Sequence, residues 1–212
     1  MSEILTRMGS AVPHQQSLWL MKLSQVTTRV SRNFAWPILV IYFMSPETEP
    51  FTKMATLWKV LYFGGSFLLL ILGLIIRLMS QGYFKNDVFV LDGPYRYVRN
   101  PVEMSSLICF LSGFLFLRVP WWYALMGLFV AFLWLSVNAT NYERALYLRM
   151  GSSFLHYKKR VRRWIPSWLP EVNKSDARYS FNRALKEERL SVLWLLGFLL
   201  VAALRFQFLK LF

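Results

Sequence analysis

Five blocks of apolar residues, separated by polar connections, dominate this sequence. The longest block, Leu57–Met79, exceeds the roughly 20 residues that a helix needs to cross a bilayer. Met104–Leu117 and Trp121–Val137 are joined by only three residues, which predicts a tight helical hairpin. Further blocks at Phe34–Met44 and Leu190–Leu209 complete the series. The pattern predicts an all-α, polytopic membrane bundle of about five transmembrane helices.

The polar connections divide the predicted bundle into four parts. Residues 1–32 form a polar or interfacial segment, 33–80 hold the first two transmembrane helices, 81–170 form a core around the hairpin, and 171–212 hold a basic linker and the final helix. Residues 18–32 are expected either to lie as an amphipathic helix in the membrane interface or to extend the first span. No cleavable signal peptide is expected, because no small-residue cleavage site follows the first apolar block.

Composition supports a membrane protein. The chain is 56% hydrophobic and 17% charged, whereas soluble domains carry about 25% charged residues. The net charge of +14 would suggest nucleic acid in a soluble protein, but here an anionic membrane surface explains it better, so nucleic acid is not an expected partner. A single cysteine and two distant histidines predict no metal site. No glycine-rich nucleotide-binding fingerprint is present.

The basic residues orient the predicted spans. Twenty of the 25 Lys and Arg residues lie in the lead up to residue 33, in Arg77–Arg99 and in Asn141–Arg189. These three regions fall on one side if the spans alternate, and the positive-inside rule makes that side cytoplasmic. We therefore expect a cytoplasmic N-terminus and, with no targeting peptide evident, a bacterial inner membrane.

A first polar block, Gly93–Pro101, precedes the hairpin. Gly93-Pro94 is typical of a turn, and Pro101 suits the first turn of the next helix. Arg96 and Arg99 are three residues apart and can share a face, which favours an anion site for a carboxylate or phosphate. The alternative is a simple anchor to lipid headgroups.

Glu103 lies at the mouth of the same apolar helix. A carboxylate facing lipid is costly, so we expect Glu103 to pair with a cation such as Arg99 or to face a polar cavity. The alternative is the ordinary preference for an acidic residue in the first turn of a helix.

A second polar block follows the hairpin. Asn138, Asn141 and Tyr142 fall on one face of a helix, with Glu143 beside them. Asparagine at membrane depth needs partners, so this face is expected to point into the protein, where it could bind an amino or ribose group. Hydrogen bonding between helices is the alternative.

The two blocks together resemble the isoprenylcysteine carboxyl methyltransferase and phospholipid methyltransferase family of integral membrane enzymes. The family's first motif reads roughly GPYR-x-x-RHP-x-Y and aligns with Gly93–Glu103. The second reads roughly EE-x-x-L-x-x-x-FG-x-x-Y-x-x-Y-x-x-x-VPR-x-x-P. The positions that keep its residue type and spacing are Glu143, Leu146, Gly151, Tyr157, Val161, Arg163 and Pro166, whereas Phe154 replaces a usual tyrosine. The resemblance covers about Arg77 to Pro170.

The resemblance implies an S-adenosylmethionine-dependent methyltransferase whose cofactor pocket is not a Rossmann fold and lies near the cytosolic face. It implies a cofactor site lined by Asp87, Val88, Phe89, Val90, Tyr95, Arg99, Asn100, Pro101, Tyr142 and Glu143. It places Asn138 near the acceptor or cofactor. Arg96 and Arg163 are expected to bind the substrate, and the catalytic candidates are Glu103, Arg99 and Glu143.

Three positions depart from the family pattern. Asn100 replaces a histidine, which removes a titrating group but keeps hydrogen bonding. Tyr142 replaces the first glutamate of a pair, and Glu103 replaces a tyrosine and could restore the lost negative charge. We therefore expect a rearranged cofactor site and an acceptor other than prenylcysteine.

The acceptor is expected to be a lipid or lipidated molecule in the bilayer. The basic cytoplasmic face favours an anionic lipid or a lipid phosphate, which needs cations to hold it and no base. An amine acceptor, as in phosphatidylethanolamine N-methylation, or a prenylcysteine carboxylate remains an alternative, and Glu103 or Glu143 could assist proton removal from an amine.

Two other functions stay open from the sequence. A sterol-reductase-like NADPH enzyme shares an Arg-His/Asn-Pro element, but its usual tail motif, VPYR-x-IP, has one more residue than Val161–Pro166. A degenerate, non-catalytic membrane scaffold would also account for the three departures.

Overall fold

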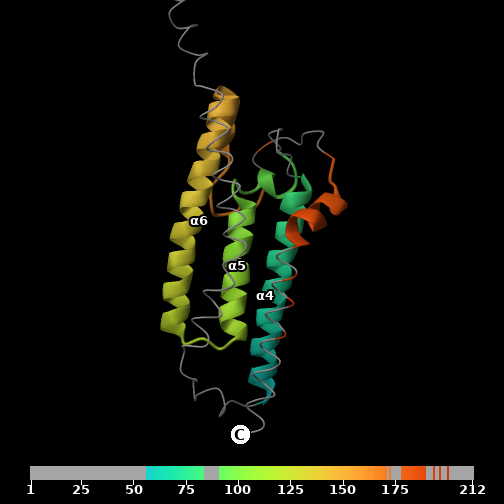
Figure 1. Cartoon of the computed structure of the whole chain (residues 1–212), viewed down its shortest axis with the longest axis vertical. Helices are drawn as coiled ribbons and strands as arrows, with labels where there is room; N and C mark the ends of the chain where they lie inside the picture. Colours follow the sequence, from blue (N-terminus) through green and yellow to red (C-terminus); the bar gives the residue numbers. More distant parts are fainter. Residues whose placement is uncertain are drawn as a thin grey trace, which may run out of the picture.

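The computed structural model describes residues 56–83, 91–170, 172 and 178–189, together with positions 193, 196 and 200. This part of the chain is all-helical and contains no strand, as Figure 1 shows. The predicted first transmembrane helix, the segment 1–32 and the expected cofactor residues 87–90 lie outside the described residues. So does most of the predicted final helix, apart from the three isolated helical positions.

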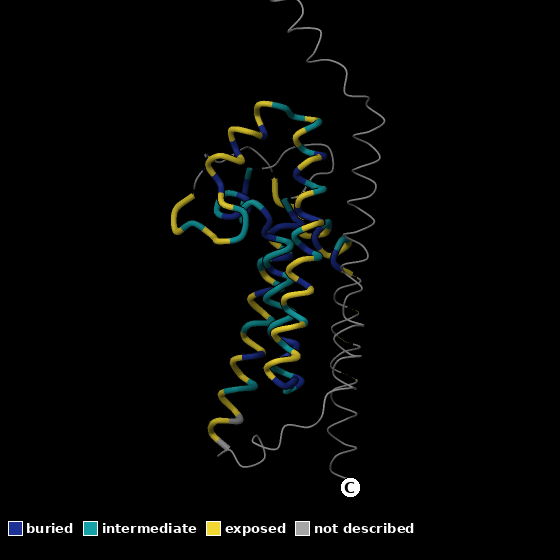
Figure 2. Tube along the Cα trace, turned by 90° about the vertical axis from the view of Figure 1, so that its left-hand side faces the viewer, coloured by how far each residue is buried: buried dark blue, intermediate teal, exposed yellow. Residues whose placement is uncertain are grey.

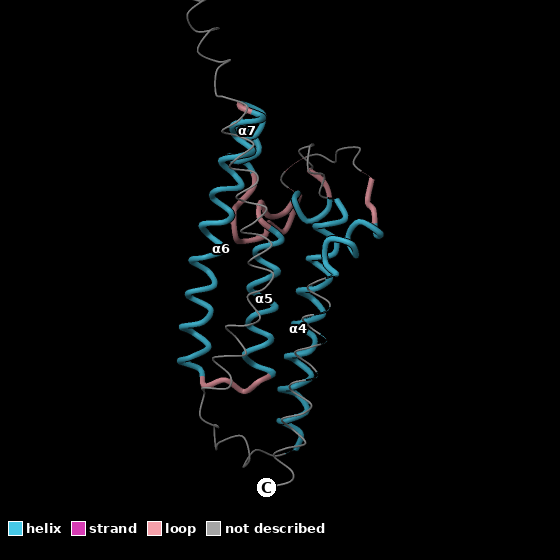
Figure 3. Tube along the Cα trace, in the orientation of Figure 1, coloured by secondary structure: helices cyan, strands magenta, loops and turns pink. Residues whose placement is uncertain are grey.

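Three long helices form the body of the molecule: α4 (Thr56–Tyr83), α5 (Pro101–Phe116) and α6 (Trp121–Met150). They run antiparallel in sequence order, with α5 between α4 and α6 (Figures 1 and 3). The predicted tight hairpin is present, because four residues link α5 to α6. Arg118 adopts φ 54° in this link, a left-handed conformation that helps to reverse the chain.

Small residues allow α4 and α5 to lie close together. A Cβ atom added to Gly73 would come within 2.6 Å of Cys109 Sγ and 3.2 Å of the carbonyl oxygen of Ser105. Farther along the same interface, the Ser112 hydroxyl donates a 2.7 Å hydrogen bond to the carbonyl oxygen of Ser66. Such packing is typical of helix pairs that associate in lipid.

α6 is longer than the apolar pattern indicated. The apolar block ends at Val137, but the helix continues to Met150, because Ala145, Leu146 and their neighbours favour a helix whether or not they are buried. It stops at Gly151, whose φ of 54° suits glycine. The last turns of α6 rise beyond the ends of α4 and α5 in Figure 1. The predicted polar face of Asn138–Glu143 is therefore helical.

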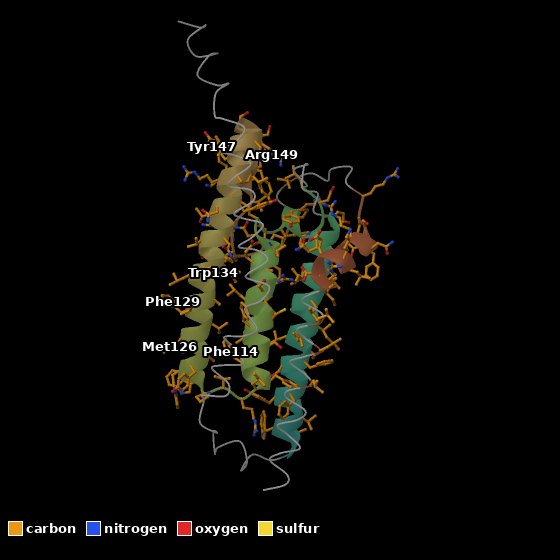
Figure 4. The ribbon with its side chains drawn as sticks, in the orientation of Figure 1. Phe114, Met126, Phe129, Trp134, Tyr147 and Arg149 are labelled. Atoms are coloured by element: carbon orange, nitrogen blue, oxygen red, sulfur yellow. The ribbon has the colours of Figure 1, made fainter. Side chains whose placement is uncertain are left out.

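Apolar side chains cover the outside of the bundle. The segments Val60–Tyr83 and Trp121–Met150 are long and apolar enough to cross a membrane, yet only 17% and 22% of their most apolar windows are buried. A core helix of a soluble protein would be mostly buried. Figure 2 shows exposed residues recurring along these helices, and Figure 4 shows Met126 and Phe129 on the outer side of α6. This surface suits contact with lipid.

The polar connections gather at the end where α4 finishes and α5 begins. The 3-10 helix η2 (Gly93–Arg96) and helix α7 (Ser152–Arg160) both lie there (Figure 3). A small apolar cluster, formed by Phe154, Tyr157, Val161 and Val172, joins α7 to the segment that follows it. Residues 181–189 form another helix, which docks near the end of α4 through a hydrogen bond from the Ser180 amide to the carbonyl oxygen of Gly82.

Candidate functional site

Glu143 connects the two polar blocks. Its carboxylate accepts a hydrogen bond from Asn100 Nδ2 at 3.1 Å and pairs with Arg99 Nη1 at 3.3 Å. Only 6% of Glu143 is exposed, so these are the contacts of a buried charge. The structure thus brings together three of the residues that the sequence singled out, from segments more than 40 positions apart.

Two further cations approach the same carboxylate. Arg163 Nε lies 3.3 Å from Glu143 Oε1, and Lys158 Nζ lies 3.6 Å from Oε2. Arg163 also donates from Nη2 to the Ser136 carbonyl oxygen at 3.1 Å and to Thr140 Oγ1 at 2.6 Å. With Arg99, three cations surround one carboxylate, so this cluster carries an excess of positive charge.

Backbone hydrogen bonds hold the first block against the end of the second. The Arg99 amide donates to the Arg162 carbonyl oxygen at 2.8 Å, and the Ser167 amide donates to the Tyr97 carbonyl oxygen at 2.9 Å. The Tyr157 hydroxyl adds a 2.9 Å bond to the carbonyl oxygen of Tyr95. These bonds lie in loops and at helix ends, and they hold the segments that carry Arg99 and Arg163 next to Glu143.

Asn100 occupies the N-cap position of α5 but makes no side-chain capping bond. Asparagine at this position ordinarily accepts a hydrogen bond from the first turn of its helix. Here its side chain reaches Glu143 instead. Pro101 follows at the start of the helix, where its missing amide hydrogen costs nothing.

Buried tyrosines lie beside the ion cluster. Burial raises the pKa of Tyr95 well above its usual value, and Tyr142, Glu103 and Tyr157 lie within electrostatic range and raise it further. Burial likewise raises the pKa of Tyr157, an effect that Arg99 opposes and Glu143 reinforces. The phenols of Tyr95 and Tyr157 therefore stay neutral and able to donate hydrogen bonds at physiological pH.

The sequence allowed Glu103 to pair with Arg99. In the described structure Arg99 pairs with Glu143 instead. Glu103 lies within electrostatic range of Arg77, Arg163 and Glu143, and it is an electrostatic neighbour of Tyr142. Glu103 thus faces the polar interior. The two departures from the family motif, at positions 103 and 142, lie close enough to influence each other.

The spacing of Arg96 and Arg99 favours a shared anion site, with an anchor to lipid headgroups as the alternative. The structure gives them different partners: Arg96 Nε donates to the carbonyl oxygen of Val172 at 3.0 Å, whereas Arg99 binds Glu143. Among the described residues, the cations that converge on one carboxylate are Arg99, Arg163 and Lys158, and a joint anion site of Arg96 and Arg99 stays a prediction.

Asn138 lies one helical turn deeper in α6 than Tyr142. It is 4% exposed, and within the described part of the chain its Nδ2 atom has no hydrogen-bond partner. Arg99 Nε is also a buried donor without a hydrogen-bond partner in the described part of the chain. Buried donors of this kind usually bind something, so both can serve a ligand.

A second buried ion pair was not predicted from the sequence. Arg77 Nε lies 2.5 Å from Glu188 Oε2, and Arg77 Nη1 donates to Ser106 Oγ at 2.5 Å. The pair joins α4 to the helix at residues 181–189 across 111 positions. One signal pointed to it: an arginine within an apolar helix must find a polar partner. Lys158 was also missed as a ligand of Glu143, since basic runs are common on surfaces.

Among the described residues, no group of three or more His, Cys, Asp or Glu side chains is arranged to hold a metal ion. Comparison of the chain with models of known protein families, with curated proteins and with solved structures found no match.

Proposed function

We propose that this chain is an integral membrane S-adenosylmethionine-dependent methyltransferase that modifies a lipid acceptor in the bilayer. The observation that carries this proposal is the junction of Arg99, Asn100 and Glu143. Two motifs that resemble those of a methyltransferase family, distant in sequence, meet in one buried polar cluster at one end of the helical hairpin.

Membrane embedding is the first part of the proposal. α4 and α6 are long and apolar enough to cross a bilayer, and α5 is apolar throughout most of its 16 residues. Their large apolar side chains are exposed, which would favour aggregation in water and is favourable in lipid. The ion cluster lies at the end that carries the basic segments, which the positive-inside rule assigns to the cytosol, and we propose a bacterial inner membrane.

The donor set suits the polar groups of the cofactor. Arg99 and Asn100 would hold its carboxylate, because Arg99 Nε is a buried donor without a partner in the described chain and the surrounding charge is positive. The Glu103 carboxylate and the Tyr142 and Tyr95 rings would lie near its positive centre, since carboxylates and aromatic faces stabilise cations. When bound, this cofactor supplies an electrophilic methyl group.

Glu143 has a supporting role in this scheme. Both of its oxygens are engaged by Asn100 and by three cations, so its carboxylate is occupied by contacts within the protein. It therefore orients Arg99 and Arg163. Within the described part of the chain, Glu103 has arginines only at longer electrostatic range, Arg77 and Arg163, and it is the better candidate for a group that contacts a reacting molecule.

The charge balance favours an anionic acceptor, such as a lipid carboxylate or lipid phosphate. Arg163 and Lys158 stand at the more exposed side of the cluster, with side-chain exposures of 30% and 50%. They can hold an anionic headgroup that arrives from the membrane surface. Such an acceptor needs no base, and the task of the protein is to hold it against the donor in a reactive geometry.

The test is incubation of the purified full chain with methyl-labelled cofactor and a bacterial lipid extract, followed by mass spectrometry of the labelled lipid. Labelled acidic lipids are expected. Labelled aminolipids with no labelled acidic lipid would favour the phosphatidylethanolamine-type alternative and overturn the anionic acceptor.

A non-catalytic scaffold is the second candidate, because the contacts of Glu143 are complete without a ligand and could serve only to join the two blocks. Binding of S-adenosylhomocysteine by calorimetry separates the two functions. Saturable binding supports the enzyme, and no binding at millimolar concentration supports the scaffold. NADPH in the same assay tests the reductase alternative.

A further inference from the structure

Arg163 fixes the position along the axis of α6 at which the loop after α7 contacts this helix. It bonds to the Ser136 carbonyl oxygen and to Thr140 Oγ1 on α6. Thr140 is 19 residues beyond Trp121, which at 1.5 Å per residue is about 28 Å along the helix. The hydrocarbon core of a bilayer is about 30 Å thick. The loop therefore lies one hydrocarbon thickness from the other end of the hairpin.

Two exposed tryptophans lie at the start of α6, at the end of the hairpin opposite the loop. Trp121 and Trp122 are 69% and 47% exposed and stack edge to face there. Tryptophan is enriched at both membrane–water interfaces. If Trp121 and Trp122 mark one interface, the loop bonded to Thr140 lies at the other.

The loop presents apolar side chains outward at that level. Ile165, Trp168 and Leu169 are 67%, 100% and 76% exposed, although the Ser167 amide between them is fixed by its bond to Tyr97. The centroid of the Trp164 ring lies 5.1 Å from that of Phe132 on α6. A loop that is held in place and still exposes large apolar side chains is suited to contact with lipid.

Basic side chains border these apolar groups. Lys159, Arg160 and Arg162 are exposed at the end of α7 and the start of the loop. A tryptophan- and leucine-bearing loop flanked by arginines is complementary to an interface where acyl chains meet acidic headgroups.

We propose that residues 159–169 form an interfacial anchor that inserts Ile165, Trp168 and Leu169 among the headgroup-proximal parts of the acyl chains in the cytoplasmic leaflet and binds acidic phospholipid headgroups through Arg160 and Arg162. Because the Arg99 amide bonds to the Arg162 carbonyl oxygen, the anchor holds the Glu143 cluster at the depth of the lipid phosphates. The inference rests on the proposed membrane embedding and not on methyl transfer.

Depth is measured by spin labels on the full chain in phosphatidylcholine–phosphatidylglycerol nanodiscs. Single cysteines at Trp168→Cys, Phe129→Cys and Arg149→Cys, in a Cys109→Ala background, are compared for accessibility to oxygen and to a water-soluble nickel complex. Phe129 is 62% exposed near the middle of the predicted span, and Arg149 lies in the last turn of α6, beyond the ends of α4 and α5. The label at 168 is expected between the two.

High oxygen accessibility of the label at 129, together with high nickel accessibility of the label at 168, overturns the anchor but leaves membrane embedding intact. An aqueous signature at 129 overturns the embedding itself. These outcomes are therefore distinguishable, and neither readout depends on enzymatic activity.

Lipid preference is measured by native mass spectrometry during titration of delipidated protein with phosphatidylglycerol. Arg162→Gln is expected to weaken binding of the first lipid roughly fivefold, as one basic residue near a membrane surface contributes. Arg149→Gln removes the same charge from a position above the proposed interface and is expected to leave binding nearly unchanged. Equal effects of the two variants would overturn headgroup binding at the anchor.

Discussion

Asn100 Nδ2 donates a 3.1 Å hydrogen bond to Glu143 Oε1, linking the residue before α5 to the C-terminal half of α6 across 43 positions. The bond joins a neutral side chain to a carboxylate that three cations already surround. A titrating histidine, usual at this position in the family that the motifs resemble, is not needed for the contact, because one N–H donor suffices.

Replacement of Glu143 tests whether the cluster is organised around one charge. Glu143→Gln leaves Arg99, Arg163 and Lys158 without their shared counter-ion, and breaking a buried pair typically costs about 3–5 kcal/mol. We expect a lower midpoint of thermal unfolding in detergent and loss of S-adenosylhomocysteine binding. Arg144→Gln, at the adjacent exposed position, is the matched control. A Glu143→Gln protein that unfolds and binds like the control would contradict the central role of this carboxylate.

Two substitutions of Asn100 separate hydrogen bonding from residue type. Asn100→His retains a donor and is expected to bind S-adenosylhomocysteine within a few-fold of the native chain. Asn100→Ala removes a hydrogen bond to a charged group, worth about 1.5–3 kcal/mol, and is expected to weaken binding by one to two orders of magnitude. Calorimetric titration measures both. Equal affinities of the alanine and histidine variants would show that the contact is incidental.

Glu103 and Tyr142 offer a charge-exchange experiment. They are electrostatic neighbours, and they depart from the family pattern in opposite senses. Tyr142→Glu alone adds a carboxylate close to Glu103 and is expected to impair folding or binding, because like charges at a buried site repel. Adding Glu103→Tyr should recover much of the loss. Independent, additive effects in a thermal-stability cycle would mean that the two positions do not compensate.

The Arg77–Glu188 pair predicts a purely structural effect. Both side chains are more than 90% buried, so Glu188→Gln leaves an unpaired arginine next to an apolar helix and is expected to destabilise the chain by about 3–5 kcal/mol. The double variant Arg77→Met/Glu188→Leu, which removes both charges, should be less damaging. Thermal unfolding in detergent measures both, with Lys186→Gln as an exposed control on the same helix. Greater damage in the double variant would point to a further role of Arg77.

Tyr157 predicts a dependence of stability on alkaline pH. Burial raises its pKa in the folded chain, whereas an unfolded tyrosine ionises near pH 10. The unfolded state therefore loses its proton first, and the free energy of unfolding should fall as pH rises above about 10. Tyr157→Phe should reduce this slope, while losing the bond to the Tyr95 carbonyl oxygen. Denaturation between pH 8 and pH 11 measures the slope, and an unchanged slope in the variant would assign it to other groups.

The sequence by itself determined the helical hairpin and the placement of two polar blocks near one end of it. Apolar block length is a local property of the sequence, so the apolar helices at Leu57–Met79 and Trp121–Val137 could be predicted without a structure, although the continuation of α6 to Met150 could not. The resemblance in motifs likewise came from residue type and spacing alone.

Only the tertiary structure decided which charges meet. Arg96 donates to the Val172 carbonyl oxygen and Arg99 pairs with Glu143, although the two arginines lie only three residues apart in one motif. The direction of each side chain depends on how η2 packs against the segment after α7. The bond between Arg77 and Glu188 spans 111 positions. No local pattern encodes such a contact, since it exists only once the separate helices have packed against one another.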